Sequence, residues 1–136
     1  MKVSDRAWRG VFFIAAAFNI AAAAFFALAP DVALALFQFP PVTGQVVWYA
    51  LFWWLVAAFG IGYYLVGRDL VANRSIALLG LVGKLGVVVV GAVLWGRGQL
   101  SSPMAALVAG DLVFSVFFLL FLSTHPATAH ERAMGH

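Results

Sequence analysis

Two ionisable residues lie inside long apolar runs, and they are the residues of this sequence most able to take part in chemistry. Lys84 lies near the middle of the run from Gly80 to Gly91, and Asp111 lies in the apolar segment that follows. A charged side chain at that depth in a bilayer is costly, so each should face a partner rather than lipid. We therefore predict that Lys84 and Asp111 form an ion pair.

Two further polar residues are expected beside this pair. Ser115 follows Asp111 by one helical turn, where its hydroxyl could bond the carboxylate or hold a water. Counting the helical rise puts Lys84 about 18 Å, Asp111 about 12 Å and Asn19 about 15 Å from the same membrane surface. The long side chain of Lys84 can cover the difference in depth from Asp111 by extending along its helix. The sequence thus predicts one central polar layer.

Two interpretations of this layer stay open. The pair and Asn19 could fix the register of the helices, because buried ion pairs can specify structure rather than add stability. Alternatively, the layer could handle a proton or bind a ligand, since ionisable groups inside membranes mark relays and binding sites. Trp53 and Trp54, in the aromatic second apolar run, are candidates for the wall of such a site.

Composition identifies the class of protein. The 136 residues are 65% hydrophobic and 10% charged, whereas soluble domains are about one-half apolar and one-quarter charged. The net charge of +3 comes without any basic run, so no nucleic-acid partner is expected. Cysteine is absent, which excludes disulfides and thiolate metal sites. We therefore expect an integral membrane protein that lies in the lipid bilayer.

Neither a metal site nor a cofactor is expected. The spacing of the three histidines matches no compact ligand motif, and we expect them to be solvated in the tail: His125, His130 and His136. No Gly-rich phosphate loop or nucleophile elbow is present. We therefore name no catalytic residue.

Four apolar segments predict a single all-α domain over residues 1–136, an antiparallel bundle of four transmembrane helices. The expected spans are 8–29, 46–66, 75–95 and 104–122, followed by a polar tail over 123–136. About 20 residues are enough to cross the hydrocarbon core. The first apolar run has 19 residues, too many for the core of a signal peptide, which has roughly 7–15.

A short interfacial helix is expected between the first two spans. Pro30 should stop the first helix, and Asp31 should cap a new one over residues 32–38 before Pro40 and Pro41 turn the chain. A plain loop is the alternative.

The basic residues predict the orientation. With a cytoplasmic N-terminus, the cytoplasmic side holds Lys2, Arg6, Arg9, Arg68, Arg74 and Arg132, and the opposite side holds only Arg97. Basic residues favour the cytoplasmic side, so a multi-pass protein of the cell (inner) membrane with both termini in the cytoplasm is expected.

Several short motifs spread along the chain resemble those of small bacterial four-helix membrane proteins. They are Phe18-Asn19, Pro40, Trp48, Gly62-Tyr63, Gly83-Lys84 and Asp111-Leu112. In architecture the chain looks distantly like the DoxX-like and EXPERA-type proteins, which are compact four-helix membrane proteins. The EXPERA-type sterol-handling proteins have several intramembrane acidic residues, and only Asp111 is present here. The resemblance therefore implies a fold rather than an activity.

These observations favour a small integral membrane binding or accessory protein, rather than an enzyme, with a polar core of Lys84 and Asp111. It would hold an apolar small molecule or a lipid between the aromatic second span and the polar layer. A small proton-coupled transporter and a lipid-modifying membrane enzyme are the alternatives. An oligomer or a complex with a partner protein is compatible with each of them.

Overall fold

The fold is all-helical, as the sequence predicts. The computed structural model describes residues 3–126. Its helices are α1 (Asp5–Leu28), α2 (Pro30–Leu36), α3 (Val46–Arg68), α4 (Arg74–Gly96) and α5 (Ser102–Thr124). All but α2 are long and apolar enough to cross a membrane, which confirms the four spans and the short helix after the first. These are the features of a small multi-pass membrane protein.

Local capping explains where the long helices begin. The Ser4 side chain accepts a hydrogen bond from the backbone N–H of Ala7, so α1 begins at Asp5, three residues before the expected span. Ser101 caps α5 in the same way through Met104. Pro103 lies in the first turn of α5, where its missing N–H costs nothing, and this helix therefore begins before the proline.

The start of α2 differs from the prediction. Asp31 was expected to cap this helix, but the capping position is Ala29, without a side-chain hydrogen bond. Pro30 is the first helical residue, because its fixed φ suits a first turn. The carboxylate of Asp31 lies inside that first turn, where a negative charge still favours the helix N-terminus.

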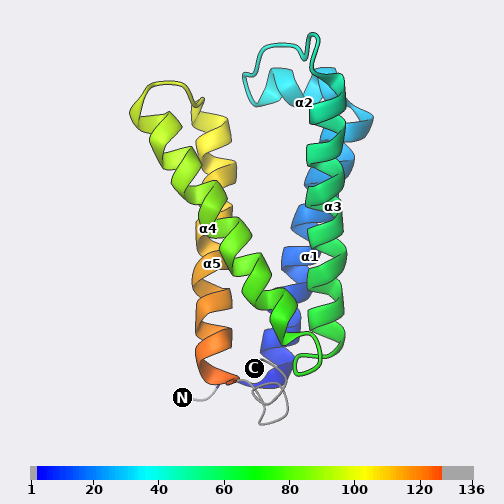
Figure 1. The fold of residues 1–136 in the computed structure, drawn as a ribbon, viewed down its shortest axis with the longest axis vertical. Helices are drawn as coiled ribbons and strands as arrows, with labels where there is room; N and C mark the ends of the chain where they lie inside the picture. The colour runs from blue at the N-terminus through cyan, green and yellow to red at the C-terminus, as the bar shows by residue number, and fades with distance from the viewer. Residues whose placement is uncertain (1–2, 127–136) are drawn as a thin grey trace, which may run out of the picture.

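The four long helices form two pairs, α1 with α3 and α4 with α5 (Figure 1). Glycines bring each pair together. A Cβ on Gly60 of α3 would lie 3.2 Å from the carbonyl oxygen of Ala16 in α1, and one on Gly91 of α4 would lie 2.7 Å from Val108 in α5. Small residues at these contacts allow the helix backbones to approach closely.

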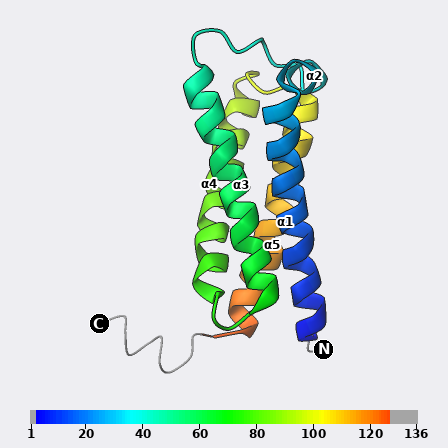
Figure 2. The ribbon, with the colours of Figure 1, turned by 90° about the vertical axis from the view of Figure 1, so that its right-hand side faces the viewer.

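The two pairs meet at one end of the bundle and diverge toward the other. In Figure 1 they converge where α1 begins and α5 ends, here called the Asp5 end, and they are apart at the α2 end. Viewed from the side, α3 lies beside α4, and α1 lies beside α5 (Figure 2). The space between the pairs therefore widens toward α2.

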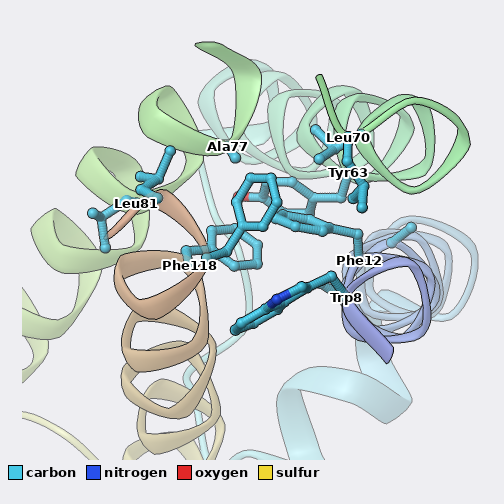
Figure 3. Packing of buried hydrophobic residues seen from close by; sticks show 12 residues of the cluster. Trp8, Phe12, Tyr63, Leu70, Ala77, Leu81 and Phe118 are labelled. Atoms are coloured by element: carbon cyan, nitrogen blue, oxygen red, sulfur yellow. The ribbon is translucent and has the colours of Figure 1, made fainter. Parts of the chain in front are cut away.

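An aromatic cluster from α1, α3 and α5 fills the Asp5 end, and Ala77 and Leu81 of α4 pack with it (Figure 3). We use this name for Trp8, Phe12, Tyr63, Phe118 and Phe121. The Phe12 ring lies 4.8 Å from Phe118 and 4.9 Å from Phe121, and Tyr63 lies edge-on to Phe118 at 5.0 Å. Aromatic pairs at such distances attract each other beyond the burial of their surface.

The second core cluster lies at the α2 end and is built differently. Its fully buried members are Ala23, Phe26, Ala33 and Trp53, which come from α1, α2 and α3 only. Phe26 and Trp53 stack with ring centres 4.0 Å apart. At this end, therefore, the α1–α3 pair is packed against α2 rather than against α4.

His125 lies on the aromatic cluster, so the expectation that it is a solvated tail residue is wrong. Its ring stacks on Phe121 at 4.6 Å, its Nε2 lies 3.3 Å from Asp5 Oδ1, and its side chain is 23% exposed. The sequence spacing could not show this, because the packing surface is assembled from both chain ends. Two other histidines of the tail lie outside residues 3–126: His130 and His136.

Candidate functional site

Lys84 lies in the interior of the bundle, on the α4 face that also carries Gly80 and Gly91. It is 4% exposed. Its ammonium group forms a salt bridge with the Asp111 carboxylate of α5, through Oδ1. The structure thus brings together the two residues that the sequence singles out.

The ammonium group also reaches the other helix pair. Lys84 Nζ donates to Asn19 Oδ1 of α1 at 3.2 Å, and Asn19 Nδ2 donates to the Val56 carbonyl of α3 at 3.2 Å. We call the sequence of contacts from Asp111 through Lys84 and Asn19 to the Val56 carbonyl the polar chain. It connects all four long helices.

Three aromatic rings surround the ammonium group. Its nitrogen lies 5.2 Å from the ring centre of Phe114, 5.3 Å from Tyr63 and 5.9 Å from Phe18. A cation at this distance over a ring is attracted by the ring's electron density. The rings and the carboxylate together compensate for the water that Lys84 lacks.

Ser115 is buried beside the pair but bonds a different atom from the one expected. Its hydroxyl donates to the backbone carbonyl of Asp111, one turn earlier in α5, at 2.7 Å. Serine in a helix commonly bonds the carbonyl four residues before it in this way. Asp111 Oδ1 is taken by Lys84, and its Oδ2 accepts no hydrogen bond from residues 3–126.

The two tryptophans named from the sequence point in different directions. Trp53 is 7% exposed and forms part of the cavity wall described below. Trp54 is 67% exposed on the outer face of α3, away from the polar chain. Consecutive helical residues are about 100° apart around the axis, so only one of the two can face inward.

A cavity of about 260 Å³ lies between the two helix pairs, on the α2 side of the polar chain. All four long helices contribute to its wall, which is almost entirely apolar. The lining side chains that carry polar atoms are Asn19, Lys84 and Asp111, together with Tyr63 and Trp53. The divergence of the pairs creates the space, and the polar chain forms its floor.

One face of α3 lines the cavity and was missed by sequence reasoning. Its residues are Phe52, Val56, Phe59 and Tyr63. They recur at intervals of four, three and four residues, which places them on one helical face, and this spacing is the signal that could have found them. Aromatic residues occur on every face of α3, so this spacing does not stand out in the sequence.

Different contacts lie at the two ends of the cavity. The aromatic cluster fills the bundle below the polar chain. At the α2 end, Ser101 Oγ donates to the Phe37 carbonyl at 2.6 Å and so ties the α4–α5 turn to the residue after α2. Two lining residues of α3 are also about half exposed on the outer surface, Phe52 at 49% and Leu55 at 57%, so the wall of the cavity is thin on this side.

Within residues 3–126, no group of three or more His, Asp or Glu side chains could hold a metal ion. The charged groups of the site are one cation and one anion in contact, so its formal charge is zero. Such a site can bind an uncharged molecule by apolar contact and hydrogen bonds.

Comparison of the chain with models of protein families, with curated proteins and with solved structures gave no match. The resemblance to DoxX-like and EXPERA-type proteins therefore stays a prediction.

Proposed function

We propose that this chain is a small integral membrane binding protein that holds an apolar small molecule or one chain of a lipid in the cavity between its helix pairs. The observation that carries the proposal is the cavity itself, about 260 Å³ of apolar space closed on one side by buried polar groups. Binding sites for small molecules are typically apolar hollows with a few convergent polar groups.

The polar chain supports this proposal by its position. A pair that served only to fix helix register could be surrounded by packed side chains. Here Asp111 lies at the cavity surface, and its side chain remains 17% exposed. Intramembrane ionisable residues beside a cavity are functional candidates by default.

The charge distribution supports an orientation in the cell (inner) membrane with the Asp5 end in the cytoplasm. Arg9, Arg68 and Arg74 lie at that end, and Arg97 follows α4 at the α2 end. Arg9 bonds the Gly67 carbonyl at 3.1 Å. Reporter fusions in the Asp69–Asn73 turn should read as cytoplasmic and a fusion at Gln99 as external, whereas a cytoplasmic signal at Gln99 would reverse the orientation.

Two glycines of α4 provide a matched test of binding. A Cβ on Gly83 would lie 3.7 Å from the Phe59 ring at the cavity wall, whereas one on Gly86 would meet nothing within 4 Å. Gly83→Leu should therefore fill the cavity, while Gly86→Leu adds the same side chain outside it.

The measurement is native mass spectrometry of protein extracted gently from membranes. We expect a bound molecule on wild type and on Gly86→Leu, and its loss from Gly83→Leu. Equal retention by the two leucine variants, or no bound molecule on any of them, would contradict the proposed function.

A further inference from the structure

We infer that the cavity selects an uncharged, single-chain alcohol that enters from the bilayer, with its hydroxyl donating to Asp111. This inference rests on the proposed function and names the class of its ligand. It follows from three properties of the site: its charge, the accessible atom on its floor and its size.

The charge of the floor disfavours ionic ligands. Lys84 and Asp111 already neutralise each other, so a charged head group would bring an uncompensated net charge into the site. A charge brought into an apolar site without its own partner pays a large desolvation cost. A neutral head group avoids this cost.

The accessible polar atom on the floor is an acceptor. The side chain of Lys84 is 5% exposed and is enclosed by three aromatic rings, whereas that of Asp111 is 17% exposed. Asp111 Oδ2 has no donor from the part of the chain between residues 3 and 126. A donor on the ligand can therefore bond this oxygen, and a hydroxyl supplies one without carrying charge.

The size of the cavity fits one slender chain. A cavity of about 150 Å³ holds benzene, so about 260 Å³ holds, in proportion, a chain of about ten carbons. Phe52 and Leu55 both line the cavity and lie half exposed on the outer face of α3, so entry of a molecule dissolved in the bilayer is inferred on this side.

Brominated ten-carbon probes test the inference through tryptophan fluorescence, since bromine quenches a tryptophan that it contacts. The protein should carry Trp48→Phe, Trp54→Phe and Trp95→Phe, which remove the tryptophans that are 73%, 67% and 52% exposed. Trp53 then reports on the cavity, and Trp8 remains buried in the aromatic cluster at the other end. The probes are 10-bromodecan-1-ol, 1-bromodecane, 10-bromodecanoate and 10-bromodecylammonium, titrated in the same detergent.

We expect saturable quenching by the alcohol at a mole fraction about tenfold lower than for bromodecane, as one hydrogen bond to a charged group would give. The two charged probes should need a mole fraction at least as high as that of bromodecane to give the same quenching. In the double variant Lys84→Met, Asp111→Leu, the advantage of the alcohol should vanish, so the alcohol and bromodecane should have equal midpoints. The order of the quenching midpoints of the four probes, measured on the protein with an intact Lys84–Asp111 pair, decides the inference even if this variant cannot be purified.

Equal midpoints for the alcohol and bromodecane would overturn the alcohol inference while leaving the cavity as an apolar binding site. Tightest quenching by the carboxylate or the ammonium probe would also overturn it. Quenching that is unsaturable for every probe would contradict the proposed function itself, so the two failures are distinguishable.

Discussion

Lys84 of α4 donates a 3.2 Å hydrogen bond to Asn19 of α1, and this bond links the two helix pairs at the level where they begin to diverge. On one side of this contact the aromatic cluster packs all four long helices together. On the other side lies the cavity. The same ammonium group holds Asp111, so one lysine both joins the pairs and sets the chemistry of the cavity floor.

The Lys84–Asp111 pair should behave as a coupled unit. Removing one partner leaves a buried charge unpaired, so Lys84→Met and Asp111→Leu should each lower the free energy of unfolding by about 3 kcal/mol. The double variant has no unpaired buried charge, so its free energy of unfolding should fall by far less than the sum of the two single losses. Unfolding of the four proteins in mixed micelles, analysed as a double-mutant cycle, measures the coupling. Simple addition of the two single penalties would show that the residues are not energetic partners.

The aromatic cluster should tolerate no added side chain on α4. A Cβ on Gly80 would lie 2.5 Å from the Tyr63 ring and 3.1 Å from Phe118. Gly80→Ala should therefore destabilise the protein by about 1–3 kcal/mol, the usual cost of overpacking a core. Gly86→Ala is the control, because its Cβ meets nothing within 4 Å. Thermal melting in one detergent compares the two, and equal melting temperatures would contradict the packing described here.

The α3–α4 turn should weaken in acid. Backbone N–H groups of Ala72 and then Val71 donate to the Asp69 carboxylate and, together with the charge of Arg9, lower its pKa from the ordinary value of 3.8. Because the folded pKa is the lower one, this stabilisation is present above pH 3.8 and is lost as pH falls through the folded value. An NMR titration of the Asp69 carboxyl should give a midpoint below 3.8. A midpoint at or above that value would show that the turn does not hold the carboxylate, and Asp69→Asn should remove the pH dependence.

The helices could be predicted because their signal is local. About 20 apolar residues between turns are enough for a span, and the four long helices and α2 appear where the sequence indicates them. The pairing of Lys84 with Asp111 followed from the cost of isolated charges in lipid and from the short turn between the two helices. Asn19 could be placed at the right depth by counting the helical rise.

The size and shape of the cavity could not be predicted, because they depend on the angle between the helix pairs. That angle is set by side chains distant in sequence, such as the ring of Phe12 against Phe118 at one end and Phe26 against Trp53 at the other. No local pattern shows that the second cluster omits α4. The hydrogen bond from Asn19 to the Val56 carbonyl could not be predicted either, because every residue has a backbone carbonyl and the sequence does not indicate which one accepts.

Occupancy of the cavity by an apolar chain is tested most directly by photolabelling in membranes with a diazirine-bearing ten-carbon alcohol, followed by mass-spectrometric mapping. We expect saturable labelling of inward-facing residues on both pairs, Val56 of α3 and Leu107 of α5, which decanol competes away and Gly83→Leu abolishes. Labelling confined to outer-face residues such as Trp54 and Val89, rising linearly with probe and indifferent to decanol, would contradict a bound chain in the cavity.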